Sequence, residues 1–140
     1  MNGISARLGR LPQFLRFAAV GGAGFVVNAV AFYVALDMIG LGKNASWLFA
    51  FVPAVTFTWW GNRMLTFPDR AGRGMTAIVR EWGKFVATNG FGALVNYLTY
   101  FSALNWTPAP FDNPFIALAA GVLTGLVFNF TLSKWFVFRA

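Results

Sequence analysis

The chain has 140 residues, of which 58% are hydrophobic, 19% aromatic and only 11% charged, and its net charge is +7. Soluble globular domains carry about 25% charged residues, so this composition nearly excludes one and predicts an integral membrane protein. The lack of Cys and His excludes disulfides, thiol catalysis and His-ligated metals. In a membrane chain the basic excess favours loop topology and anionic lipid over nucleic acid.

Four apolar stretches follow one another along the chain, at about 14–39, 45–64, 85–104 and 115–136. At about 1.5 Å per residue, each can cross a hydrocarbon core of about 30 Å. The first is too long for a signal peptide and no A-x-A-like cleavage site follows it, so we expect it to stay as an anchor. The sequence predicts an all-α fold, an integral membrane four-helix bundle in a single domain over 1–140.

The connections set the expected topology. Spans one and two are joined by 37–44, spans three and four by 105–114, and the longest connection, 68–83, lies in the centre. All 11 Lys and Arg residues except Lys43 fall on the side of the central connection and the two termini. Because basic residues concentrate in cytoplasmic loops, both termini are predicted to be cytoplasmic.

Two cytoplasmic segments place apolar residues at helical spacing ahead of a span. They consist of Ile4, Leu8, Leu11 and Leu15, and of Met75, Ile78, Val79 and Trp82. Either segment could lie along the inner leaflet or form a helical extension of the following span, and the sequence leaves both interpretations open.

The two halves of the chain resemble each other. At a shift of 68 residues, 16–36 falls on 84–104 with identical residues at eight of the 21 paired positions, including a shared G-x-G-x-x-x-N spacing. Spans two and four match at a shift of 71, which pairs Asn62, Arg63 and Phe67 with Ser133, Lys134 and Phe138.

Repeat one covers about 14–67 and repeat two about 84–138, with the cytoplasmic segment 68–83 between them. Each repeat is one helical hairpin, and both start inside. The repeats are therefore parallel and related by a pseudo-two-fold axis along the membrane normal. We expect a site on or near that axis, built from equivalent residues of both halves.

Each span has a basic residue at its cytoplasmic end, and these are Arg16, Arg63, Lys84 and Lys134. They could ring the inner mouth of the bundle and bind an anionic headgroup, since Arg binds phosphate bidentately and Lys acts as a point charge. Asn62 and Ser133, directly before two of these charges, would add hydrogen bonds. The alternative is a set of snorkelling anchors that fix orientation.

Uncharged amides lie at membrane depth in Asn28, Asn89, Asn96 and Asn129. Burying an amide without a partner costs several kcal/mol, so each should face protein or a polar cavity. They could form interhelical hydrogen bonds or a polar path for a substrate. The pair Asn28 and Asn96 is favoured for the path because the repeat places both near the axis.

Three tryptophans form another candidate set. Trp59, Trp60 and Trp135 stand beside the basic ends of spans two and four, as in an interfacial belt, and the alternative is stacking on sugars at the entrance.

Glycines in spans one and three predict close helix packing or a narrow gap for a lipid tail. They are Gly21, Gly22, Gly24, Gly90 and Gly92.

The acidic residues Asp37, Asp69, Glu81 and Asp112 lie in loops or at span ends. No two of them can be placed as general acid and nucleophile, and they provide no metal site. We therefore expect no catalytic residue, no cofactor and no enzymatic activity.

Four segments carry a resemblance to a known family: RFAAVGGAGFVVN at 16–28, KFVATNGFGALVN at 84–96, GNRMLTF at 61–67 and SKWFVF at 133–138. They resemble the GtrA-like family of small four-span bacterial membrane proteins, over essentially the whole chain. The most specific element is the Asn-Arg-x-x-x-Phe motif that closes span two. Ser133 departs from the Asn of the first half.

The resemblance implies translocation of undecaprenyl-phosphate-linked monosaccharides across the bacterial inner membrane for surface polysaccharide synthesis, with a membrane glycosyltransferase as partner. One alternative is a non-transporting subunit that docks and orients that glycosyltransferase through the basic central loop. Another is a small drug or cation exporter, which the lack of an acid within the membrane disfavours. Because four spans seldom enclose a wide polar path, we expect a homo-oligomer.

Overall fold

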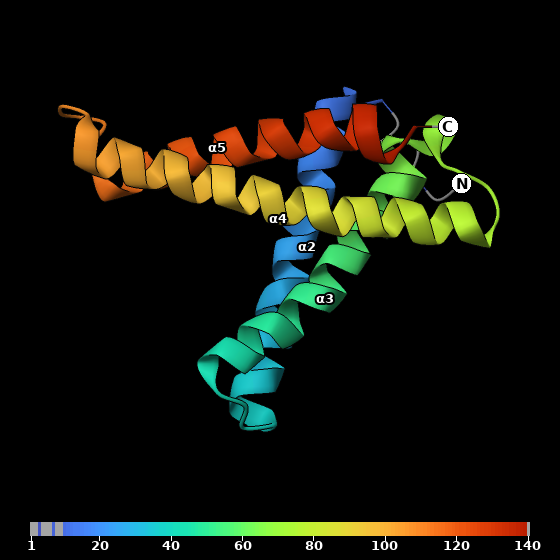
Figure 1. Cartoon of the computed structure of the whole chain (residues 1–140), viewed down its shortest axis with the longest axis horizontal. Coiled ribbons are helices and arrows are strands. Elements are labelled where there is room, and N and C mark those ends of the chain that lie inside the picture. Colours follow the sequence, from blue (N-terminus) through green and yellow to red (C-terminus); the bar gives the residue numbers. More distant parts are fainter. Residues whose placement is uncertain (1–2, 4–6, 8–9, 140) are drawn as a thin grey trace. The chain divides into compact units, whose positions relative to one another are not determined.

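The computed structural model of the protein describes Gly3, Arg7 and residues 10–139. This part of the chain is built from helices and contains no strand (Figure 1). Its elements are α2 (Gln13–Tyr33) with the π-helical turn η1 (Val34–Met38), α3 (Lys43–Gly61) with the π-helical turn η2 (Asn62–Thr66), the 3₁₀ turn η3 (Pro68–Arg70), α4 (Met75–Trp106), and α5 (Pro114–Leu132) with the π-helical turn η4 (Ser133–Val137). The predicted all-α fold with four long helices is confirmed.

The helices belong to two compact units, one made of Met1–Trp82 with Phe138–Ala140 and the other of Gly83–Val137. The first unit contains the hairpin of α2 and α3. The second contains α5 and most of α4. Each unit therefore contains one helical hairpin, and the first also contains the start of α4.

α4 settles one of the open interpretations. It runs without a break from Met75 to Trp106 over 32 residues. The apolar residues ahead of the third span are thus a helical extension of that span. In the corresponding N-terminal segment, Ile4 and Leu8 lie outside the described residues, while Leu11 and Leu15 are exposed, at 39% and 48%.

Two of the described helical segments are long and apolar enough to cross a membrane by length and composition, Gln13–Met38 and Pro114–Val137. Only 17% of each apolar window is buried within the protein, whereas the core helix of a soluble domain would be mostly enclosed. Large apolar side chains stay exposed, with Phe25 at 74% and Phe115 at 81%. Such extensive apolar exposure fits hydrocarbon surroundings rather than water.

The first hairpin is closely packed through a glycine. The Cγ2 methyl of Thr58 on α3 occupies the space that a Cβ on Gly24 would need, and a Cβ on Gly61 would lie 2.8 Å from Val20 Cγ1. By contrast, Gly21 and Gly22 have no heavy atom within 4 Å of that position. Close packing therefore applies to Gly24 and not to its two glycine neighbours.

The second hairpin repeats this arrangement. A Cβ on Gly92 of α4 would overlap the Asn129 amide of α5, and a Cβ on Gly121 would lie 2.6 Å from Asn96 Oδ1. Gly90 has open space there. Gly92 and Asn129 occupy the positions that the sequence repeat aligns with Gly24 and Thr58, so the two hairpins pack through equivalent pairs.

A stripe of small buried residues runs along the second helix of each hairpin at intervals of four. The stripes consist of Ser46, Ala50 and Ala54 on α3, and of Ala117, Gly121 and Gly125 on α5. Residues four apart share a helix face, and small ones let two backbones approach closely. These residues are aligned by the same shift of 71, so the packing face is part of the repeat.

Local signals fix the helix ends. Asn113 caps α5, with Oδ1 accepting from the backbone N–H of Phe115 at 3.0 Å, and Pro114 takes the first helical position. Gly40 follows η1 with φ of 82°. That left-handed conformation lets the backbone N–H of Leu41 return to the carbonyl of Ala35 at 2.9 Å.

Candidate functional site

The motif at the end of α3 folds into the π-helical turn η2. The backbone N–H of Phe67 donates to the carbonyl of Asn62, five residues back, at 2.8 Å, so this turn is wider than an α-helical one. Asn62 and Thr66 are each only 1% exposed, and Thr66 Oγ1 donates to Asn62 Oδ1 at 2.6 Å. The Asn62 side chain is thus enclosed within the turn, and Phe67 stacks on Phe138 with ring centroids 4.9 Å apart.

Arg16 connects the start of α2 to this turn. Its guanidinium donates through one terminal nitrogen to the carbonyl of Leu65 at 2.7 Å, and Gln13 Nε2 donates to the carbonyl of Thr66 at 3.2 Å. The Nε of Arg16 is buried and has no hydrogen-bond partner among the described residues. Arg16 and Gln13 therefore each donate to one backbone carbonyl of the wide turn.

Arg63 forms an ion pair with Glu81, a carboxylate only 4% exposed. One terminal nitrogen of Arg63 donates to Glu81 Oε1 at 2.6 Å and the other donates to the carbonyl of Gly72. Trp59 Nε1 also donates to Glu81 Oε1, at 3.2 Å, and the N–H of Gly72 donates to Oε2 at 3.0 Å. We call Trp59, Arg63, Gly72 and Glu81 the Arg63–Glu81 clasp, which ties α3, the connecting segment and α4 together.

In the second unit, the corresponding cations lie over aromatic rings. Lys84 Nζ is 4.8 Å from the centroid of the Phe136 ring. Lys134 Nζ is 5.8 Å from the Phe130 centroid and 5.2 Å from that of Trp135. A ring face attracts an ammonium group through its quadrupole, so aromatic side chains contribute to the surroundings of both lysines.

Ser133 takes the position of Asn62 in the second repeat. It is fully buried, and its Oγ has no hydrogen-bond partner among the described residues. It also begins a π-helical turn, η4, as Asn62 begins η2. The turn geometry is therefore shared by the two repeats, while the internal Asn–Thr hydrogen bond belongs to the first.

The amides expected at membrane depth have different surroundings. Asn89 Nδ2 donates to the carbonyl of Phe85 in its own helix at 2.9 Å. Asn96 and Asn129 pack into glycine-lined spaces between α4 and α5, and the buried Oδ1 of Asn129 has no partner in the described part of the chain. Asn28 is half-buried in α2. Of the four, Asn89 is the one already satisfied by its own backbone.

The three candidate tryptophans also differ in their surroundings. Trp59 belongs to the Arg63–Glu81 clasp. Trp60 and Trp135 are exposed, at 55% and 61%, so they present their rings outward. This arrangement fits an interfacial position for the latter two, and their proposed contact with sugars stays a prediction.

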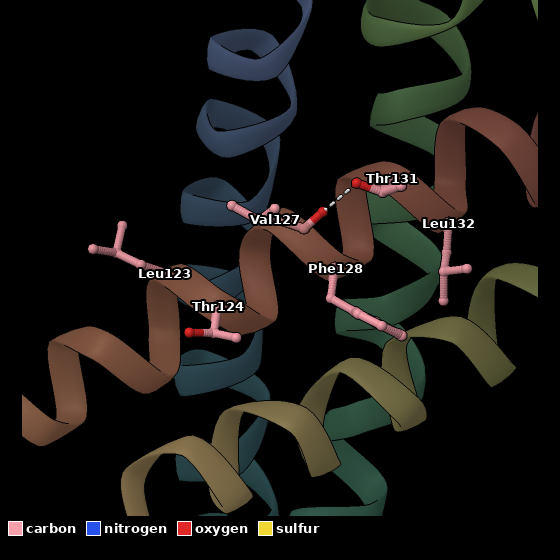
Figure 2. A pocket seen from close by; sticks show the side chains of 6 residues that line it. All are labelled: Leu123, Thr124, Val127, Phe128, Thr131 and Leu132. Carbon is pink, nitrogen blue, oxygen red and sulfur yellow. Dashed lines mark hydrogen bonds between the residues drawn. The ribbon is translucent and has the colours of Figure 1, made fainter. Parts of the chain in front are cut away.

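α5 carries an apolar groove of about 470 Å³. Figure 2 shows the side chains that line it, which are Leu123, Thr124, Val127, Phe128, Thr131 and Leu132. The hydroxyls of Thr124 and Thr131 donate to the carbonyls four residues back, at 2.7 and 2.8 Å. Because the hydroxyls are satisfied by their own helix, the groove presents mainly carbon atoms.

Sequence reasoning missed the role of Glu81, which it grouped with acids of loops and span ends, and that of Gly72 and Thr66. Nothing in their spacing indicates a pairing, since Arg63 and Glu81 are 18 residues apart and separated by a turn. In the part of the chain that the structure describes, no group of three or more carboxylate, Cys or His side chains could hold a metal ion.

The family model for the GtrA/DPMS transmembrane domain matches residues 16–138. The chain belongs to this family. The match begins at Arg16 and ends at Phe138, so it includes both hairpins and their closing turns. No curated protein and no solved structure matched the chain. The protein is thus a membrane domain of the GtrA/DPMS family, and the resemblance seen in the sequence is confirmed.

Proposed function

We propose that the protein translocates undecaprenyl-phosphate-linked monosaccharides across the bacterial inner membrane for surface polysaccharide synthesis. The carrying observation is the membership of the whole double hairpin in the GtrA/DPMS transmembrane family. In this proposal the chain is multi-pass, has no enzymatic activity and acts beside a membrane glycosyltransferase that makes the lipid-linked sugar. A homo-oligomer would provide a wider path than four spans alone.

The physical basis is the match between an amphiphilic substrate and an amphiphilic protein. A polyprenyl phosphate has an acidic headgroup and a long apolar tail. Cations stand near the ends of α2, α3 and α5 and in the first third of α4, and exposed apolar side chains lie on the same helices. The phosphate would bind the cations, the tail would remain against apolar side chains, and transport would be downhill because no nucleotide motif supplies energy.

A second candidate is the non-transporting subunit that docks the glycosyltransferase. The observation that favours it is the Arg63–Glu81 clasp, because it holds the connecting segment at Gly72 and so presents exposed Arg73 on a rigid surface. Asn96 and Asn129 also pack against glycines, which suits helix packing as well as a polar path.

Reconstitution in proteoliposomes distinguishes the two. Transfer of a fluorescent undecaprenyl-phosphate sugar between leaflets is measured with the wild-type chain, with Asn28→Ala/Asn96→Ala, and with Asn105→Ala as the control, since Asn105 is an exposed amide at the end of α4. We expect transfer by the wild type and the control, and its loss in the double variant. Normal transfer by the double variant would disprove the polar path, and no transfer by any of them would favour the docking subunit.

A further inference from the structure

Three hydrogen-bond donors of different kinds converge on the Glu81 carboxylate. Its Oε1 accepts from a terminal nitrogen of Arg63 at 2.6 Å and from the indole Nε1 of Trp59 at 3.2 Å. Its Oε2 accepts from the backbone N–H of Gly72 at 3.0 Å. Guanidinium and backbone N–H groups are also the donors that bind phosphate oxygens. The Arg63–Glu81 clasp is therefore a built anion site, and the anion in it belongs to the protein itself.

Gly72 brings its backbone close to α4. A Cβ at this position would lie 2.9 Å from the Cβ of Ala77 and 3.7 Å from Glu81 Oε2, so a larger residue would push the connecting segment away. The carbonyl of Gly72 accepts from the second terminal nitrogen of Arg63, and that bond does not involve Glu81. Arg63 and Gly72 would therefore stay joined when another anion replaces the carboxylate.

The ion pair is suited to such an exchange. The Arg63 side chain is 16% exposed against 4% for Glu81, so the cation can be approached from outside the protein. A buried ion pair gains little net free energy because desolvation offsets the attraction, whereas a buried charge without a partner is costly. Replacing Glu81 by a second anion keeps Arg63 paired and avoids that cost. The displaced carboxylate would reach water by a change of rotamer in the second turn of α4, beside exposed Arg80.

We propose that the Arg63–Glu81 clasp is a phosphate-binding site that Glu81 occupies until the lipid binds. The lipid phosphate then replaces the carboxylate on Arg63, Trp59 and Gly72, and Glu81 turns to solvent. Because Glu81 is tethered, its effective concentration at the site is high, so a free phosphate ion does not displace it. A lipid is itself held at the protein by its chain in the bilayer, and it can compete. This inference rests on the proposed function, whose lipid phosphate it assigns to the first hairpin.

The first test uses no lipid. Glu81→Gln removes the internal anion and keeps the size of the side chain. Inorganic phosphate should raise the Tm of this variant in detergent by about 4 °C relative to chloride at equal ionic strength, because the ion binds the folded state at Arg63. Wild type should show no shift, since the carboxylate occupies the site. Arg63→Met/Glu81→Met should show none either, since it lacks the cation.

The second test is native mass spectrometry of the full chain in detergent with undecaprenyl phosphate and with undecaprenol, which lacks the phosphate. We expect Glu81→Gln to retain about tenfold more undecaprenyl phosphate than wild type, the scale of one charge-assisted hydrogen bond, with retention of undecaprenol unchanged. Asp69→Asn removes the same charge from an exposed residue of the connecting segment and should behave as wild type. Arg63→Met/Glu81→Met should lose the preference for undecaprenyl phosphate, which tests the site even where Glu81→Gln does not fold.

Four results would overturn the inference. They are the lack of a phosphate shift in Glu81→Gln, an equal shift in the double Met variant, equal gains in lipid retention from Glu81→Gln and Asp69→Asn, and a phosphate shift without any gain in lipid retention. The last would assign the site to free phosphate and reject the lipid. Failure of the proposed function appears separately, since the phosphate shift and the gain in lipid retention without transfer in proteoliposomes would keep the site and reject translocation.

Discussion

At the scale of single residues, the Arg63–Glu81 clasp joins three segments of the first unit through hydrogen bonds. Glu81 accepts from Trp59, Arg63 and the backbone of Gly72, so its two oxygens are satisfied although only 4% of the side chain is exposed. A buried carboxylate needs such partners, because removing it from water is costly. Removing either charged partner would therefore leave the other as a poorly solvated, unpaired charge.

Removing one charge of the clasp should be more harmful than removing both. We expect Glu81→Gln to destabilise the protein by about 3 kcal/mol, since it leaves the Arg63 charge in a poorly solvated place. The double variant Arg63→Met/Glu81→Met should recover much of that loss. Thermal unfolding in detergent, followed by helical circular dichroism, measures both.

Asp69→Asn serves as the control for the clasp, because Asp69 is an exposed carboxylate of the same connecting segment. Its unfolding should match that of the wild type to within about 0.5 kcal/mol. Additive effects of the two Met substitutions would contradict the pairing, because coupled residues give non-additive free energies.

At the scale of elements, each hairpin is held by contacts between small residues. Inside a membrane the hydrophobic effect does not drive two helices together, because lipid tails are as apolar as the side chains. Helix association there depends on how closely the two backbones can pack. Gly24 meets Thr58 and Gly92 meets Asn129, both in direct contact with the facing helix. The glycines of the sequence pattern therefore include some that pack against the facing helix, such as Gly24 and Gly92, and others that face open space, such as Gly22.

This difference predicts opposite signs for one substitution. Gly24→Ala should destabilise the α2–α3 hairpin by about 1–3 kcal/mol, because the new methyl overlaps Thr58 Cγ2. Gly22→Ala should be neutral or stabilise by up to about 1 kcal/mol, since it meets no atom within 4 Å and alanine favours a helix. Unfolding of the two variants in detergent gives both values.

Thr58→Ser provides the matching rescue. Serine lacks the Cγ2 methyl that Gly24→Ala would meet and keeps the hydroxyl that donates to the carbonyl of Ala54 at 3.0 Å. Gly24→Ala/Thr58→Ser should therefore be more stable than Gly24→Ala alone. If the double variant is no better, the loss has another origin than this contact.

At the scale of the whole molecule, the repeat determines the shape of each unit. The two hairpins share buried small-residue stripes, packed glycines and π-helical closing turns. They differ in their cations, since the first repeat binds Arg63 in the clasp and Arg16 to a backbone carbonyl, while the second places its lysines over rings. A duplicated framework thus carries two different chemical surfaces.

The predicted topology can be tested with single cysteines, because the chain has none of its own. Lys43→Cys and Asp112→Cys should react with a membrane-impermeant maleimide in intact cells. Asp69→Cys should react only after permeabilisation, since ten basic residues favour the cytoplasm for its side. All three positions are exposed in the structure. Labelling of Asp69 and Asp112 from the same side would contradict four spans.

Much of the fold could be predicted from the sequence because its signals are local. Apolar length fixed the positions of the four helices to within a few residues, except that α4 begins at Met75, ahead of the span expected from about Phe85. The candidate site was less predictable. Arg63 and Lys134 occupy equivalent positions of the repeat, yet one contacts a carboxylate and the other aromatic rings.

By itself, the sequence determined the membrane class, the helices, the repeat and the family, because composition, hydrophobic length and motif spacing do not depend on distant contacts. Only the tertiary structure decided that Glu81 pairs with Arg63, that Gly24 is packed while Gly22 is open, and that α5 carries an apolar groove. Those features depend on which atoms meet across helices and turns, and neither residue spacing nor composition specifies such contacts.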